Sequence, residues 1–178
     1  AQRLEKLDQR KTLLKPILQA LDRGKPADVL AACTSLTEKD QRFAPLCQRY
    51  KADALRDLNQ HDALESFLKM ILADRATPWA YAALGKLLFK RGKASEAQAI
   101  YERAMIAFPM IPTLYDGLAD VLVARGDARR AQSVLEDAVR LSPLAVRRQR
   151  LLGKLAMGNE DFESASKAYR HAVSQGQY

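Results

Sequence analysis

Few side chains in this sequence have the spacing that catalysis or metal binding needs. The two histidines, His61 and His171, have no serine, cysteine or aspartate arranged with them in a catalytic motif. Cys33 and Cys47 lack the Cys-x-x-Cys spacing of zinc sites, and two reduced, packed thiols are typical of a cytoplasmic protein. The segment GKASEA, residues 92–97, lacks the glycine-rich cradle of a phosphate loop. We therefore expect no enzyme, no cofactor and no metal site.

A basic cluster near the C-terminus has a spacing that suits anion binding. Arg147, Arg150 and Lys154 are three and four residues apart, so they share one face of a helix. Guanidinium groups on such a face can hold carboxylates or phosphates. A solvated helix surface explains the same spacing, and it also explains Asp116 and Asp120, which are four residues apart. Both interpretations remain open.

Composition limits the function classes. The 178 residues carry a formal charge of +8 and are 48% hydrophobic, which allows a packed core and argues against wholesale disorder. Acidic residues are interspersed with the basic ones nearly throughout, so a solvated basic surface is favoured over nucleic-acid binding. No apolar run is long enough for a membrane span. The start is charged and lacks a signal core and an initiator Met, which predicts a cytoplasmic chain that is either a piece of a longer protein or a processed or trimmed product.

One fixed interval organises the chain and explains its small residues. Leu84, Leu118 and Leu152 follow one another at intervals of 34 residues (118 − 84 and 152 − 118). This period is typical of helical repeats. Small residues recur with them, at Gly85, Ala119 and Gly153, at Ala97, Ala131 and Ala165, and at Ala104, Ala138 and Ala172, while Tyr101, Leu135 and Tyr169 supply bulk. Alternating small and large residues let two antiparallel helices approach closely. Each unit is therefore predicted to be a helix pair that must stack on its neighbours to bury both faces.

The middle unit shows where its two helices should begin and end. Pro78 suits a first helical turn, and the first helix is predicted over residues 78–91. Gly92 can take the left-handed conformation that ends it, and the second helix is predicted over residues 94–108, before Pro109. In the last unit Glu160 holds the glycine place. We expect the preceding Gly158 and Asn159 to make that turn instead.

These repeats resemble the tetratricopeptide repeat, whose signature has small residues at places 8, 20 and 27 and proline at place 32. The resemblance implies an all-α, right-handed superhelical solenoid of about five antiparallel helix pairs, without catalytic activity. It covers nearly the whole chain, with units at about 11–44 (degenerate), 45–77, 78–111, 112–145 and 146–178, after an N-terminal linker or extended helix at 1–10. The resemblance implies a module that binds other proteins.

A narrower resemblance is to the C-terminal part of bacterial two-component response regulators that contain tetratricopeptide repeats. It rests on LLKPILQALDRG (residues 13–24), TPWAYAALGKLLFKRG (77–92) and VRLSPLAVRRQRLLGKLA (139–156). In that family a receiver domain precedes the repeats, and this sequence contains none. The resemblance implies an output or scaffold module that relays phosphorylation to a partner. The alternatives are a free-standing scaffold in an envelope or pilus assembly complex, and a nucleic-acid binder acting through the basic face.

Leucines at 3–4 spacing mark the N-terminal segment. They are Leu4, Leu7, Leu14, Leu18 and Leu21, and they could extend the first helix as a coiled-coil seam that forms a homodimer. An amphipathic capping helix explains the same pattern. Pro16 should kink or restart this helix.

The first helix of each pair lines the concave face of such a solenoid, where a partner peptide would bind. The candidate partner-binding residues on this face are Trp79, Lys86, Phe89, Lys90, Asp116, Asp120, Arg147, Arg150 and Lys154. An aromatic anchor with basic neighbours suits a protein or peptide ligand of acidic character, although Trp79 can equally pack between units. Ala82 and Lys86 do not match the carboxylate clamp of chaperone-binding repeats. The last helix, with Ser164, Ser166, Lys167, Arg170 and His171 off its core face, is expected to cap the array itself.

Overall fold

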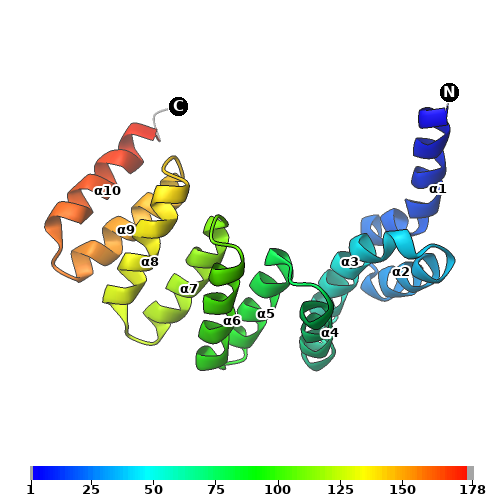
Figure 1. The fold of residues 1–178 in the computed structure, drawn as a ribbon, viewed down its shortest axis with the longest axis horizontal. Helices are drawn as coiled ribbons and strands as arrows, with labels where there is room; N and C mark the ends of the chain where they lie inside the picture. The colour runs from blue at the N-terminus through cyan, green and yellow to red at the C-terminus, as the bar shows by residue number, and fades with distance from the viewer. Residues whose placement is uncertain (1, 176–178) are drawn as a thin grey trace. The chain divides into compact units, whose positions relative to one another are not determined.

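The computed structural model describes the backbone of residues 2–175 and the side chains of residues 11–175. The described residues form ten α-helices, one short 3-10 helix and no strand, which confirms the all-α fold of five helix pairs (Figure 1). The helices are α1 (Gln2–Asp22), α2 (Pro26–Lys39), η1 (Gln41–Phe43), α3 (Ala44–Asp57), α4 (His61–Asp74), α5 (Pro78–Lys90), α6 (Ala94–Ala107), α7 (Pro112–Ala124), α8 (Ala128–Leu141), α9 (Val146–Gly158) and α10 (Phe162–Gln175). The chain divides into two compact units, residues 1–67 and 68–178.

The turn inside each helix pair has one residue in the left-handed region. These residues are Gly24, Asn59, Gly92, Gly126 and Glu160, with φ of 61°, 57°, 76°, 81° and 62°. After each of them, a backbone N–H bonds back into the first helix, as from Lys93 to the Leu88 carbonyl at 2.9 Å. This is the bond that closes a helix ending in a left-handed residue.

The expectation for the last turn was wrong. Gly158 is the final residue of α9, Asn159 has an ordinary φ of −92°, and Glu160 itself takes the left-handed conformation. The position in the repeat, rather than the residue type, sets this backbone conformation. Closing the turn requires it, since the Asp161 N–H reaches the Ala156 carbonyl at 2.9 Å.

The first unit is built on α1, α2 and α3. Ile17 and Ala20 of α1 are buried with Val29 and Cys33 of α2 in one core cluster. α1 does not restart at Pro16, because it runs through this residue as one helix, and a kink there stays a prediction. Pro16 is exposed, so its ring does not enter the core.

The leucine seam is only partly described. Leu14 is half-buried, and Leu18 and Leu21 are exposed, while the side chains of Leu4 and Leu7 lie outside the described residues. Dimerisation through this helix therefore stays a prediction.

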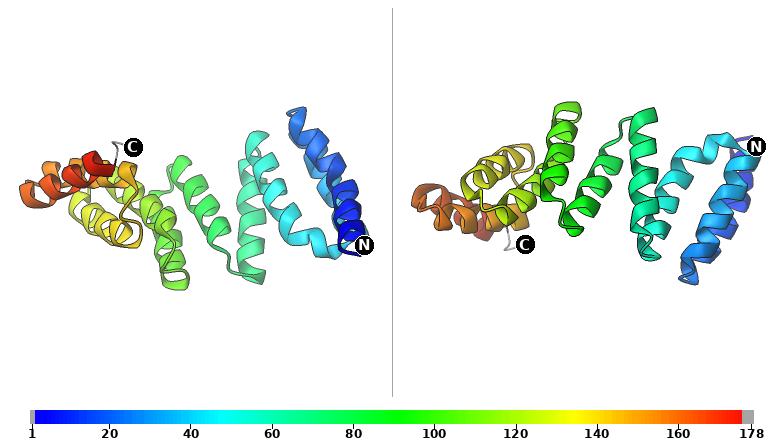
Figure 2. Two further views of the ribbon diagram at one scale, coloured as in Figure 1. Left: turned by 90° about the horizontal axis from the view of Figure 1, so that it is seen from above. Right: turned by 90° about the horizontal axis from the view of Figure 1, so that it is seen from below.

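The second unit contains three regular pairs, α5–α6, α7–α8 and α9–α10. Each helix packs on the next, and α5 also packs on α7 (Figures 1 and 2). The ring of Tyr101 fills the joint between the first two pairs. Gly85 of α5 and Gly117 of α7 face it, and a β-carbon on either would lie within 2.6 Å of a ring atom. The alternation of small and large residues thus sets the approach of the helices.

Candidate functional site

The first helices of the second unit, α5, α7 and α9, carry all the residues that the sequence singled out for partner binding. Their charged members are largely exposed: Lys86 and Lys90 on α5, Asp120 on α7, and Arg147, Arg150 and Lys154 on α9. Trp79, Phe89 and Asp116 are half-buried. We call the surface formed by these nine residues the first-helix face.

Asp116 has a partner that sequence reasoning did not assign. Arg148 of α9 donates from Nε and Nη2 to the two carboxylate oxygens of Asp116 on α7, both at 2.7 Å. The Arg148 side chain is 10% exposed and that of Asp116 is 37% exposed. The paired hydrogen bonds with Asp116 raise the pKa of Arg148. The pair ties α7 to α9, so Asp116 already has an ion-pair partner within the chain.

The remaining guanidinium nitrogen of Arg148 is unsatisfied. Nη1 is buried and has no hydrogen-bond partner among the described residues. A sequence signal for this pair would have been the separation of Asp116 and Arg148, which is close to one repeat length and places them on successive first helices. Spacing within one helix, which drew attention to Arg147 and Arg150, cannot find it.

Asp120 is the centre of a charge arrangement that joins three helices. Loss of surrounding water raises the pKa of its carboxyl, and the negative charge of Asp116 adds to this rise. Arg147 of α9 and Lys86 of α5 act in the opposite direction. These opposing effects show that Lys86, Asp120 and Arg147 share one electrostatic environment. Across the face the exposed charges on α5, α7 and α9 are thus basic, acidic and basic.

The buried Tyr101 of α6 lies beneath this face, close enough for the charge of Asp120 to act on its hydroxyl. Burial, followed by the charge of Asp120, raises the pKa of the Tyr101 hydroxyl to about 12. The phenol is therefore neutral at physiological pH, and its oxygen lies 3.4 Å from the Ala82 carbonyl as a long hydrogen bond.

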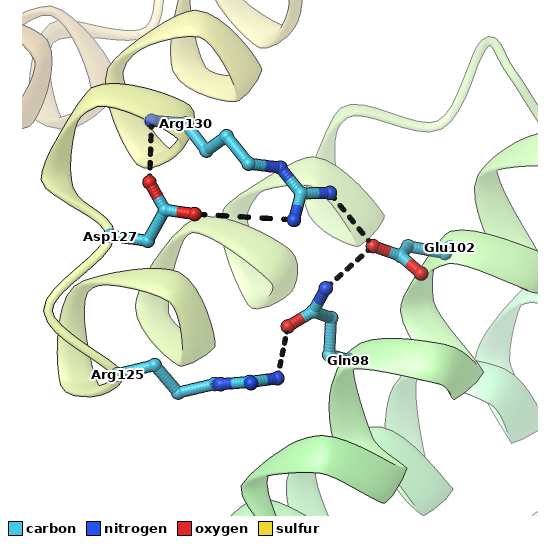
Figure 3. Close-up of polar contacts among 5 residues, drawn as sticks. All are labelled: Gln98, Glu102, Arg125, Asp127 and Arg130. Carbon is cyan, nitrogen blue, oxygen red and sulfur yellow. Dashed lines mark hydrogen bonds and ion pairs between the residues drawn. The ribbon is translucent and has the colours of Figure 1, made fainter.

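A different polar network joins the second helices to the turns of the next pair (Figure 3). Gln98 donates to Glu102 within α6 at 2.8 Å and accepts a bond from Arg125 at the end of α7. Glu102 also accepts from Arg130 of α8 at 2.9 Å. Asp127 caps α8 by accepting from the Arg130 backbone N–H.

An equivalent joint recurs one repeat later with altered chemistry. Gln132 donates to Glu136 and to Asp161, at 3.0 and 2.7 Å, and accepts from Asn159 at 2.7 Å. Asn159 stands where Arg125 stands in the earlier joint. These networks fix neighbouring pairs and do not lie on the first-helix face.

A hollow of about 470 Å³ lies between α8 and α10 over the base formed by α9. Val139, Pro143, Leu152 and Ala168 give it apolar walls, and Lys167 and His171 are among its polar lining. Sequence reasoning assigned no role to this position. It lies on the side of the second helices, away from the first-helix face.

The described residues contain neither a candidate metal site nor a candidate membrane-spanning helix. Within it, no three His, Cys, Asp or Glu side chains gather as a metal site. Among the same residues, no helix combines the length and apolarity required to span a bilayer.

Comparison with known proteins supports the fold. The family model described as "Tetratricopeptide repeat" matches residues 117–178. MamA from Desulfovibrio magneticus RS-1 is similar in structure, with a TM-score of 0.73, 18% identity and 94% of each chain covered. TTC0263, a thermophilic TPR protein of Thermus thermophilus, gives a TM-score of 0.65 at 17% identity, covering 93% of this chain and 90% of that one.

A third solved structure is similar over most of this chain. PilF from Pseudomonas aeruginosa gives a TM-score of 0.75 at 16% identity, with 95% of this chain and 77% of that chain covered. No curated protein matches the sequence. At these identities the likeness establishes the fold alone.

Proposed function

Because the chain has the tetratricopeptide-repeat fold, and residues 117–178 match that family, we propose that it is a protein-binding scaffold. The first-helix face of the second unit holds an extended segment of a partner. The observation that carries this proposal is the alternation of exposed charges on successive first helices, with Lys86 on α5, Asp120 on α7 and Arg147 on α9. A partner with a cation flanked by acidic residues complements it.

The half-buried aromatic residues Trp79 and Phe89 supply the apolar part of this surface. Aromatic anchors provide most of the binding energy in many interfaces, while surrounding charges set register and specificity. Arg150 and Lys154 extend the basic end along α9, which favours a ligand whose acidic residues outnumber its basic ones.

The test is selection of peptides from a random library on the intact chain, followed by charge reversal. We expect selected sequences with a basic residue between acidic ones. Asp120→Lys should weaken them by about tenfold, since it places three like charges together. Arg129→Glu is the matched control, because Arg129 is an exposed arginine on α8, outside the face. Equal binding by the wild type and Asp120→Lys would refute the assignment.

We further propose that the repeats form the output part of a cytoplasmic response regulator. The family-like segments at 13–24, 77–92 and 139–156 support this. The parent protein should then carry a receiver domain, and acetyl phosphate should change its affinity for the selected peptides. A parent without a receiver would refute the proposal.

A scaffold without a receiver is the second candidate. The repeat array alone accounts for 94% of the similar MamA chain and 90% of the TTC0263 chain, so this fold occurs without a large further domain in those structures. An envelope or pilus assembly complex would be its setting. A lipoprotein signal on the parent would favour it.

A further inference from the structure

One flank of α10 carries an apolar stripe that stays largely exposed. Phe162, Tyr169 and Val173 are seven and four residues apart and are 64%, 39% and 61% exposed. Ser166 and Arg170 lie on the same flank by helical spacing. We call these five residues the α10 edge. A helix that ends the array by itself should have a polar outer flank, whereas this flank is apolar at three of five places, which corrects the expectation of a self-capping helix.

The α10 edge corresponds, residue by residue, to surfaces that are covered inside the chain. The residues at the repeat position of Tyr169 are Tyr101 in α6 and Leu135 in α8, and they are only 5% and 0% exposed. Tyr101 is covered by α7, where Gly117 faces its ring, and Leu135 packs in a cluster that includes Leu152 of α9. The first helix of the next pair is what buries this surface at both internal joints.

The opposite flank of α10 already faces the preceding helices of the chain. Ser164, Lys167 and His171 face the hollow beside α8, and Ala165, Ala168 and Ala172 are buried. The open flank therefore lies on the far side of α10 from α8. A partner can reach it without disturbing the existing joint.

Charge at the α10 edge differs from charge at the covered joints and specifies the occupant. Arg170 stands where Glu102 and Glu136 stand in α6 and α8. Glu102 accepts a bond from Arg130 of the next pair, and neighbouring Gln98 accepts one from Arg125. Arg170 instead donates within its own helix, from Nη2 to the Ser166 hydroxyl at 2.9 Å. The complement at this edge is an acidic residue instead of a basic one.

We propose that the α10 edge docks an amphipathic helix of a partner protein, packed as α7 packs on α6. The helix carries glycine opposite Tyr169, as Gly117 faces Tyr101, because in the Tyr101 joint even a β-carbon would lie 2.4 Å from the ring. It carries an acidic residue about two turns later, as Arg125 follows Gly117. Arg125 bonds Gln98, and Ser166 holds the Gln98 place on α10, so this acidic residue lies beside the Arg170–Ser166 hydrogen bond and can pair with Arg170. This surface is separate from the first-helix face and does not rest on the proposed peptide function.

The chain itself supplies the probe. A capped peptide of residues 112–127 with Arg125→Glu (PTLYDGLADVLVAEGD) contains the glycine, the apolar stripe and the acid. Its binding to the full chain is measured by fluorescence polarisation. We expect saturable binding, weakened about tenfold when the peptide carries Gly117→Leu, since tenfold corresponds to about 1.4 kcal/mol and overpacking typically costs about 1–3 kcal/mol. A peptide that keeps Arg125 should bind about two- to fivefold more weakly.

Variants of the full chain locate the site. Val173→Ser should weaken the probe, while Ile106→Ser, at a still more exposed apolar residue of α6, should leave its binding unchanged. Arg170→Glu should reverse the preference, so that the peptide with Arg125 binds better than the peptide with glutamate. A merely sticky surface would not show this reversal.

Three results would overturn the proposal. They are absence of binding by either peptide, equal binding of the Gly117→Leu peptide, and equal loss of binding in Val173→Ser and Ile106→Ser. A second copy of this chain is the rival occupant, and sedimentation equilibrium detects it. A dimer that Val173→Ser dissociates would assign the edge to self-association and contradict the proposal.

Discussion

The glycines that face Tyr101 allow a quantitative test of how close packing holds the second unit together. A β-carbon on Gly117 would lie 2.4 Å from Cε1 and Cζ of Tyr101, which is far inside contact distance. The ring cannot retreat, because Gly85 faces it from α5 and a β-carbon there would lie 2.6 Å from Cζ. With Tyr101 only 5% exposed, Gly117→Ala must displace a helix or the ring.

The magnitude follows from two opposing effects. Alanine in place of glycine inside a helix stabilises it by about 1 kcal/mol. Overpacking a closed joint costs about 1–3 kcal/mol, and the clamped ring points to the upper end. We therefore expect Gly117→Ala to lower the free energy of unfolding by about 2 kcal/mol. The combination with Tyr101→Leu, which copies Leu135, should recover most of this loss.

Gly153→Ala is the matched control. Its β-carbon would lie 2.9 Å from ring atoms of Tyr169, but this ring is 39% exposed and can swing outward. The helix gain then dominates, and the variant should be as stable as the wild type or up to about 1 kcal/mol more stable. Urea unfolding followed by circular dichroism and by the fluorescence of Trp79 measures both. Equal destabilisation by Gly117→Ala and Gly153→Ala would refute the reasoning, because it would mean that the confinement of the Tyr101 ring does not cause the loss of stability.

The remaining predictions concern the turns and the charged pairs. Glu160→Gly should stabilise the chain by about 0.5–1 kcal/mol in urea unfolding. It removes the cost of about 1–2 kcal/mol for an L-residue in the left-handed conformation, but glycine loses more backbone entropy on folding, which offsets part of this gain. Arg148→Lys should cost about 1–2 kcal/mol in the same assay, since lysine cannot bond both oxygens of Asp116; an unchanged midpoint would mean that the pair adds nothing. The Ser164 backbone N–H, followed by the Ser164 and Gln132 side chains, lowers the pKa of Asp161, so its contribution is present above the ordinary carboxyl pKa and is lost as pH falls below it. The difference in melting temperature between wild type and Asp161→Asn should therefore shrink from pH 7 to pH 3, and a constant difference would contradict the linkage.

The sequence by itself determined the fold. The regular recurrence of Gly85, Ala119 and Gly153 against Tyr101, Leu135 and Tyr169 fixes which helix faces can approach. Prolines and glycines mark the ends of helices through local backbone chemistry, which is independent of distant contacts. Helix existence, helix pairing and the Gly92 turn were predictable for this reason.

Only the tertiary structure decided which charges act together. Lys86, Asp120 and Arg147 stand on three helices, and nothing in their own helices' spacing indicates that they share one environment. The pairing of Asp116 with Arg148 likewise depends on the angle at which successive pairs stack. Stacking also forces Glu160 into a conformation that local preference opposes, and it leaves Tyr169 39% exposed although its equivalent Tyr101 is buried. Local pattern specifies elements, whereas electrostatics and exposure depend on what the neighbouring repeat supplies.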